Sequence, residues 1–140
     1  MSPSPNAENV NWLLTQFLER AAGTEQALVV SSDGILIALA STLERSAAER
    51  VAAVVTGMRS LAEGAARLID TGRMAQVIVE FDTRFLFIAA VSGGATIGVV
   101  ARRGSDLGLI GYEVAMLVQR VGTQLTPELI SELKHALVNS

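Results

Sequence analysis

The spacing of hydrophobic positions along the chain marks four helices. From Val10 to Ala22 apolar residues recur every three or four positions, which predicts an amphipathic helix that Gly23 ends. The same spacing predicts helices over Ser46–Ile69, Leu107–Val121 and Pro127–Val138. The Ser46 helix is the longest, and Ser-x-x-Glu at its start has the spacing of a capping box.

Shorter runs, rich in β-branched and aromatic residues, predict strands. Their ranges are Gln26–Val30, Ile35–Ala40, Met74–Phe81, Phe85–Val91 and Thr96–Ala101. Short turns rich in Asp, Gly and Ser join the first strand to the second, the third to the fourth and the fourth to the fifth. Strands joined this tightly run antiparallel. The order predicts an α+β domain with a five-stranded antiparallel sheet and helices packed on it.

The long helix carries two stripes that need an explanation. One is apolar and is predicted to pack on the sheet; its members are Val51, Val54, Val55, Met58, Leu61, Ala62, Ala65 and Ile69. The other is a line of small residues, Ala53, Gly57, Ser60 and Gly64. Glycine within a helix costs about 0.5–1 kcal/mol relative to alanine. We therefore interpret the line as a close contact with the same helix of a second subunit, the alternative being an exposed face without a role.

The remaining arc of the long helix is charged. Its residues are Arg45, Glu49, Arg59, Glu63 and Arg67. Such charges are either simply solvated or meet a partner protein.

The composition is unusually hydrophobic, so some of the apolar surface needs to be buried beyond an ordinary core. Half of the 140 residues are hydrophobic, and the mean hydropathy is +0.42. The longest apolar run, Phe85–Val91, is far shorter than the roughly 18 residues that a membrane span needs, so no membrane insertion is expected. The excess therefore indicates a subunit interface. The net charge of −3 and the lack of a basic stripe argue against nucleic-acid binding.

Residues 1–8 read as a disordered tail, without the basic and apolar segments of a signal peptide. The chain has no cysteine, which excludes disulfides and thiolate metal sites and is compatible with a cytoplasmic location.

Polar clusters that could carry chemistry have simpler interpretations. Ser31-Ser32-Asp33 has no histidine nearby to act as a base, so we interpret it as a turn. His135, the one histidine, lies near the end of the last helix and lacks partners for a metal site. The glycine-rich segment from Ser92 to Gly98 lacks the lysine of a phosphate-binding loop and precedes a strand.

Two further charged groups are equally weak candidates. Glu80, Asp82 and Arg84 surround a hairpin turn, where charges commonly serve solvation, although paired carboxylates can do acid–base work. Arg102-Arg103 could bind an acidic partner or a phosphate. No group supports an active site, so we expect no catalytic residue, no cofactor and no metal.

As a composite, these features resemble the roadblock family of the dynein-light-chain type. The resemblance rests on ALVVSSDGILIALA as the first hairpin, the long small-residue helix, MAQVIVEFDTRFLFIAAV as the third and fourth strands, and SDLGLIGYEVAMLVQRV as the closing helix. It covers residues 9–122 as a roadblock domain, and residues 123–140 form a C-terminal helical extension whose role the sequence leaves open.

The resemblance implies a profilin-like sheet with the long helix on one face and the terminal helices on the other. It also implies a homodimer through the long helix and the third strand, where Met74, Gln76 and Ile78 would lie. Family members in bacteria regulate small Ras-like GTPases as scaffolds, some beside sensor kinases, and some stimulate GTP hydrolysis. The paired long helices would present the charged arc to the GTPase.

A small-ligand sensor is the competing interpretation, because profilin- and PAS-like domains share the layout of sheet and helices. A sensor keeps an internal cavity with convergent polar groups, whereas the strands here are filled with apolar side chains.

Overall fold

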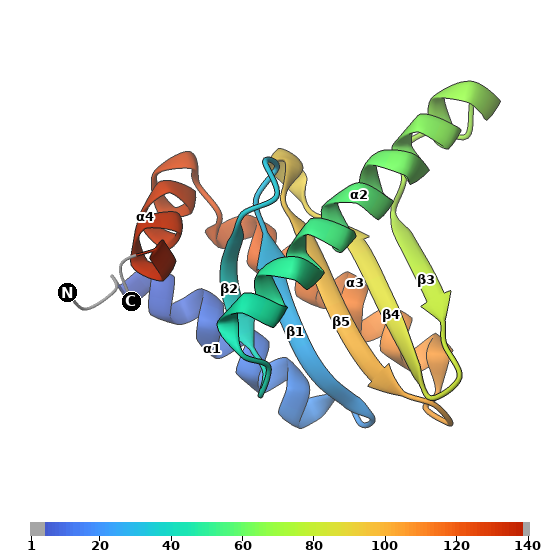
Figure 1. Ribbon diagram of the computed structural model, residues 1–140, viewed down its shortest axis with the longest axis horizontal. Helices are drawn as coiled ribbons and strands as arrows, with labels where there is room; N and C mark the ends of the chain where they lie inside the picture. The colour runs from blue at the N-terminus through green and yellow to red at the C-terminus, as the bar shows by residue number, and fades with distance from the viewer. Residues whose placement is uncertain (1–4, 139–140) are drawn as a thin grey trace.

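The structure is a computed structural model that describes residues 5–138 of the chain, with the side chains of residues 9–136. Its elements in chain order are α1 (Pro5–Arg20), β1 (Thr24–Val30), β2 (Leu36–Ala40), α2 (Arg45–Ile69), β3 (Gln76–Glu80), β4 (Arg84–Ala90), the 3₁₀ turn η1 (Ser92–Gly94), β5 (Thr96–Arg102), α3 (Leu107–Gln124) and α4 (Pro127–Val138) (Figure 1). Each predicted helix and strand is present.

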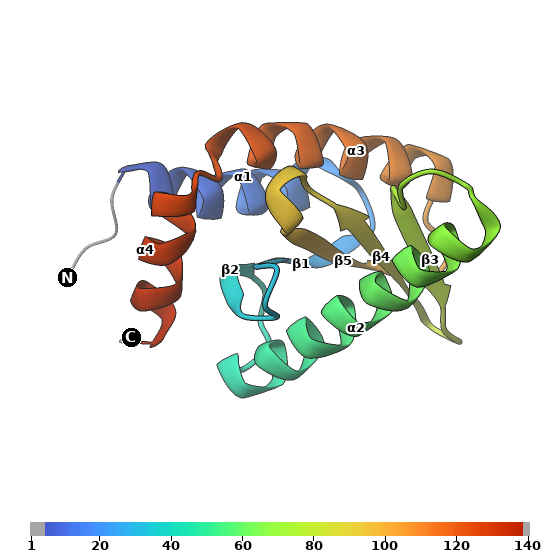
Figure 2. The same cartoon turned by 90° about the horizontal axis from the view of Figure 1, so that it is seen from above.

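The five strands form one antiparallel sheet in the order β2-β1-β5-β4-β3. Three of its pairings are hairpins, and the fourth, between β1 and β5, joins the two halves of the chain across the middle of the sheet. Helix α2 covers one face, and α1 and α3 cover the other, while α4 stands beside β2 (Figure 2). This arrangement confirms the predicted fold class.

Side chains alternate between two hydrophobic cores along each central strand. Along β4, Phe85 and Phe87 join the larger core beneath α1 and α3, whereas Leu86 and Ile88 join the smaller core beneath α2. All four are buried. This central strand is therefore covered on both faces, which explains its continuous apolar sequence.

Helix boundaries differ from the prediction at two N-termini. Helix α1 begins at Pro5, so residues 5–8 of the expected tail are helical, while residues 1–4 lie outside the described residues. Helix α2 has Glu44 as its N-cap, without a side-chain bond to the helix. The predicted capping box at Ser46 is therefore wrong, because Ser46 already lies inside the first turn.

The predicted sheet-facing stripe of α2 is also partly wrong. Ala48, Ala52 and Val55 face the sheet and are fully buried. By contrast, Val54 and Leu61 are 53% and 76% exposed. Helix α2 crosses the sheet obliquely, and its C-terminal turns project past the strands (Figure 1). The stripe is wider than the surface that the sheet can cover.

No helix in the described part of the chain combines the length and the apolar character that crossing a membrane requires.

Candidate interaction surface

One side of α2 is apolar and open to solvent. Val54, Leu61, Ala65 and Leu68 follow each other at steps of seven, four and three residues, which places them on one side of a helix. We call this row the apolar side of α2. Leu61 is 76% and Leu68 is 88% exposed. Large aliphatic side chains clustered at such exposure are typical of a protein–protein interface.

The small residues lie beside this row and face away from the sheet. Ala53, Gly57 and Ser60 are exposed, and a Cβ atom placed on Gly57 would meet nothing within 4 Å. Gly64 is half-buried, with only the tip of Arg67 within that distance. Nothing within the described chain therefore requires a small residue at Gly57. The space above it is open to another backbone.

Strand β3 forms an open edge of the sheet. The Ala75 carbonyl accepts a bond from the Ala90 N–H at 3.0 Å, and the Phe81 N–H donates to the Arg84 carbonyl at 2.8 Å. Because bonded residues alternate along an antiparallel strand, the N–H and C=O groups of Gln76 and Ile78 point away from β4. Unpaired edge groups of this kind are a template for another strand.

The apolar side of α2 and the β3 edge form one surface. Val54 shares an apolar hollow of about 330 Å³ with Phe81 and Phe85, so this side of α2 looks toward the end of the β3–β4 hairpin. Asp70, with a left-handed φ of 52°, ends α2 and turns the chain toward β3. We call the apolar side of α2 together with the outer edge of β3 the α2–β3 surface.

The predicted interface residues of β3 contribute in different ways. Ile78 is 47% exposed, and Met74 is half-buried. The side chain of Gln76 is occupied within the chain, because its Nε2 donates to the Gly111 carbonyl of α3 at 3.1 Å. Gln76 therefore offers its main chain, rather than its amide, to a partner.

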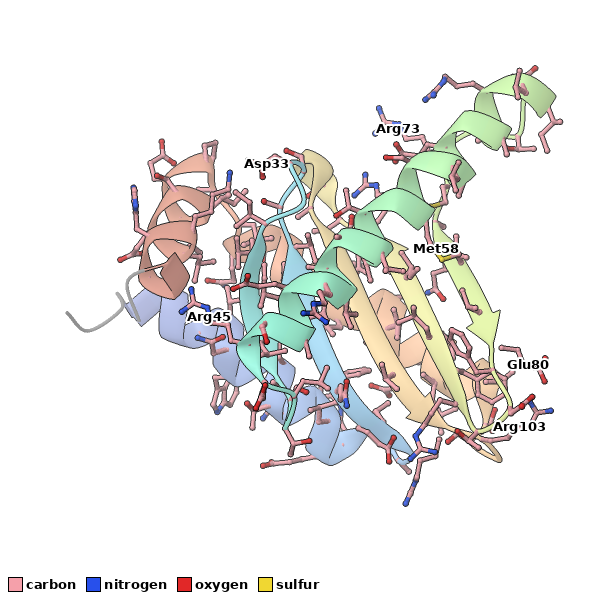
Figure 3. The ribbon with its side chains drawn as sticks, in the orientation of Figure 1. Asp33, Arg45, Met58, Arg73, Glu80 and Arg103 are labelled. Carbon is pink, nitrogen blue, oxygen red and sulfur yellow. The ribbon has the colours of Figure 1, made fainter. Side chains whose placement is uncertain are left out.

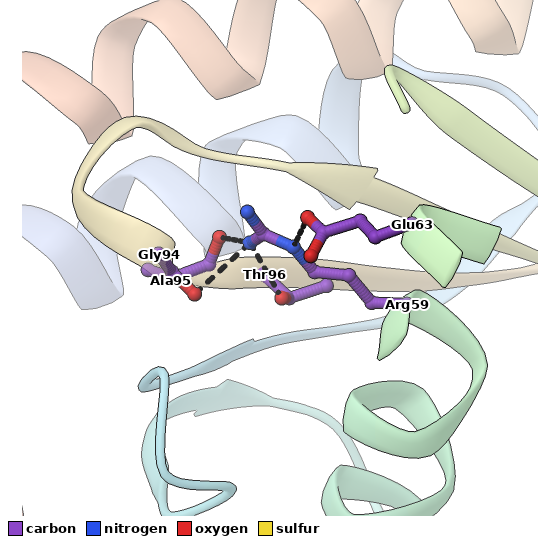
Figure 4. A network of polar contacts seen from close by, with 5 residues as sticks. All are labelled: Arg59, Glu63, Gly94, Ala95 and Thr96. Carbon is purple, nitrogen blue, oxygen red and sulfur yellow. Dashed lines mark hydrogen bonds and ion pairs between the residues drawn. The ribbon is translucent and has the colours of Figure 1, made fainter. Parts of the chain in front are cut away.

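Arg59, expected on an outward polar arc, turns inward instead. Its Nη1 donates to the carbonyl of Gly94 at 2.9 Å, to that of Ala95, and to Thr96 Oγ1 at 3.0 Å (Figure 4). Its Nε donates to Glu63 Oε1 at 2.8 Å, and its side chain is only 16% exposed. Arg59 thus ties α2 to the turn before β5.

The other charges of the arc are spread along the helix. Arg45 pairs with Glu49 at 3.1 Å in the first turns of α2. Arg67 lies 22 residues further on, about 33 Å along the helix axis. The structure therefore does not gather these charges into one cluster.

The Ser31–Asp33 turn contains an ion pair that the sequence did not reveal. The Ser31 hydroxyl donates to Asp33 Oδ1, and Lys134 of α4 donates to Asp33 Oδ2 at 2.9 Å. The hydroxyl and then the ammonium lower the pKa of Asp33 below its usual value. Figure 3 shows Asp33 at the tip of the hairpin, away from the α2–β3 surface. Nothing in the sequence places Lys134 there, because the two residues are 101 positions apart.

The remaining candidates form no reactive group. Arg103 pairs with Glu80 and lies over the Phe85 ring at 5.5 Å. His135 is exposed, and within the described residues no three metal-binding side chains converge. Within the described chain, the α2–β3 surface is therefore the main candidate for a functional site.

Comparison with known proteins agrees with this architecture. The family model of the Roadblock/LC7 domain matches residues 10–101. A Roadblock/LC7 domain from Streptomyces avermitilis is similar at 35% identity and a TM-score of 0.75, with 79% of this chain and 92% of that chain covered. None of the curated proteins matches.

Two more distant structures show the same fold. The gliding protein MglB from Thermus thermophilus has a TM-score of 0.77 at 17% identity, with 89% of this chain and 97% of that chain covered. Profilin IB from Acanthamoeba castellanii has a TM-score of 0.61 at 13% identity, with 81% of this chain and 97% of that chain covered. The latter confirms the profilin-like character of the sheet.

Proposed function

Because the chain belongs to the Roadblock/LC7 family, we propose that it is a non-catalytic regulatory or scaffold protein that homodimerises and binds a small Ras-like GTPase. The observation that carries the proposal is the α2–β3 surface. There an exposed apolar helix side lies next to an unpaired strand edge. Both features favour a second protein chain over a small molecule.

A second copy of the chain fits this surface because a twofold axis makes the same groups meet. The outward main-chain groups of β3 belong to Gln76, Ile78 and Glu80. An antiparallel β3–β3 pair centred on Ile78 puts this side chain against the partner's Ile78, and it places the main chain of Gln76 opposite that of the partner's Glu80. An apolar side chain then meets an apolar side chain at the twofold axis.

Substitution of Ile78 by proline tests this pairing. The Ile78 N–H points outward, so I78P removes a donor to the partner while leaving the β4 hydrogen bonds intact. We expect a folded monomer by light scattering coupled to size-exclusion chromatography. L61D/L68D should give the same result, whereas A115D, on an exposed site of α3, should remain dimeric. A dimeric mass for both I78P and L61D/L68D would contradict the proposal.

A single cysteine tests the position of the axis. The chain has no cysteine, so I78C carries only one thiol. A short bis-maleimide reagent should link I78C into covalent dimers at low protein concentration, and A115C should stay monomeric on a denaturing gel. Equal linking of both variants would indicate random collision.

Support for the GTPase partner comes from membership of the Roadblock/LC7 family. Of the charges in the predicted arc, Glu49 and Arg67 are exposed, whereas Arg45 is half-buried and pairs with Glu49, and Arg59 turns inward. We propose that the paired helices present Glu49 and Arg67 to the GTPase. A sensor kinase is a further partner that the resemblance allows.

Affinity capture from the native lysate, with added GDP or a non-hydrolysable GTP analogue, tests for this partner. Retention of a small GTPase mainly with the analogue supports an effector or a stimulator of hydrolysis, and retention in both states supports a constitutive scaffold. Binding of the purified GTPase should then weaken in E49K/R67E. Capture of no small GTPase in either state contradicts the proposed partner.

The small-ligand sensor also has an observation in its favour. A groove of about 760 Å³ lies between the end of α2 and the end of β4, and its lining includes Arg67, Arg73 and Met74. A thermal-shift screen with nucleotides and metabolites tests this alternative. A ligand that raises the melting temperature of the wild type but not of R67A/R73A would favour it.

A further inference from the structure

The two edges of the sheet are treated differently. On β2, Leu36, Ile37 and Ala38 are 4%, 1% and 1% exposed. On β3, by contrast, none of the five residues is fully buried. An edge strand this deeply buried needs a cover on its outer side.

Helix α4 is that cover near the β1–β2 turn. It contacts β2 and α1, and Figures 1 and 2 both show it standing beside β2. Leu129 and Leu133 anchor it, at 4% and 3% exposure, in the core cluster that contains Ile37. Lys134 also links α4 to the β1–β2 hairpin, through its ion pair with Asp33.

The sequence of β2 offers no protection of its own. The strand reads Leu-Ile-Ala-Leu-Ala, without charge or proline. Apolar edge strands that lack such residues tend to pair with other chains. The β3 edge, by comparison, carries Gln76 and Glu80.

We infer that α4 is an edge cap, which closes the β2 edge against pairing with β2 of a second copy of this chain. This inference rests on the proposed dimer in one respect, namely that β3 is the edge left for assembly. A chain with one open edge stops at a closed twofold dimer, whereas a chain with two open edges can continue into longer assemblies. The C-terminal extension would thus set the size of the assembly.

Detaching α4 in the full chain tests the cap. L129D/L133D places two carboxylates where apolar anchors are buried, and S131D/A136D adds the same charge at exposed positions of the same helix as the matched control. We expect sedimentation velocity to show at least a twofold larger mass for L129D/L133D, rising with concentration, while the control keeps the wild-type mass. Amides of α4 should lose protection from hydrogen exchange in the first variant only.

The test separates the cap from the dimer. In the I78P background, detaching α4 should convert monomers into dimers through β2. If I78P leaves the wild-type mass unchanged, the proposed dimer fails, but a mass increase caused by L129D/L133D still supports the cap. If L129D/L133D does not unfold cooperatively, and so is not a folded protein, the milder variant L133A/K134E takes its place in the mass measurement. An unchanged mass at every concentration, in a variant whose α4 amides have lost protection from hydrogen exchange, overturns the inference.

Discussion

Arg59 provides a quantitative test of how α2 is held on the sheet. Its guanidinium donates to two carbonyls in the turn before β5, to the Thr96 hydroxyl at the start of β5, and to Glu63 on its own helix. R59A removes all of these bonds at once.

The size of the effect follows from burial and charge. Hydrogen bonds to a charged group contribute about 1.5–3 kcal/mol each when buried, and neutral ones about 0.5–1.5 kcal/mol. The Arg59 side chain is 16% exposed, and Thr96 is 2% exposed, so water replaces the lost bonds only in part. Gly94 is half-buried, and its carbonyl can regain water. We therefore expect R59A to lower the free energy of unfolding by about 2–3 kcal/mol.

Urea denaturation followed by circular dichroism, at one fixed protomer concentration, measures this loss. Fixed concentration matters because association adds to apparent stability. R67A is the matched control, since Arg67 is exposed and two turns further along the same helix. It should change stability by less than about 0.5 kcal/mol. R59K keeps the positive charge but loses the planar guanidinium group with its several N–H donors. Its free energy of unfolding should therefore lie between those of the wild type and R59A.

A loss of under about 0.5 kcal/mol for R59A would refute the reasoning. It would mean that the turn holds its conformation without Arg59, and that the residue is free to serve a partner after all.

Three further predictions concern folding. A52L should lower the free energy of unfolding by about 1–3 kcal/mol because Ala52 is fully buried against the sheet, whereas A115L on an exposed helical position should be nearly neutral; urea titration compares them. D106A should cost about 1 kcal/mol in the same assay, because Asp106 accepts the Leu109 N–H at the start of α3. The lowered pKa of Asp33 adds stability that is present above its unfolded pKa, near 3.8, and lost as the pH falls through the folded value. D33N should therefore show a smaller loss of melting temperature on acidification than the wild type, and an equal loss in both would contradict this linkage.

The order of helices and strands followed from the sequence because local patterns encode it. The continuous apolar runs of β4 and β5, the helical spacing in α3 and the Asp33-Gly34 turn depend on neighbours a few residues away. The small residues of α2 were also visible, and they do face away from the sheet. The family resemblance then added that the long helix covers one face of the sheet and the terminal helices the other.

The direction of individual side chains needed the tertiary structure. Val54 and Leu61 belong to an apolar pattern that reads as core, yet they are exposed, because they lie on a side of the helix that the sheet does not cover. Arg59 reads as a surface charge, but its long side chain reaches a turn 35 residues away. Helical periodicity gives the angle between residues, not the width of the surface below them.

The two sheet edges show the same division most clearly. The sequence by itself determined that β2 and β3 are strands and that the chain ends in a helix. The family resemblance had placed the third strand at a dimer contact, but only the tertiary structure decided that β2 is the other edge of the sheet and that α4 covers it. The contacts that decide it, such as Lys134 with Asp33, join residues far apart in the chain, and no local pattern of apolar and polar positions records which distant segment fills a given edge.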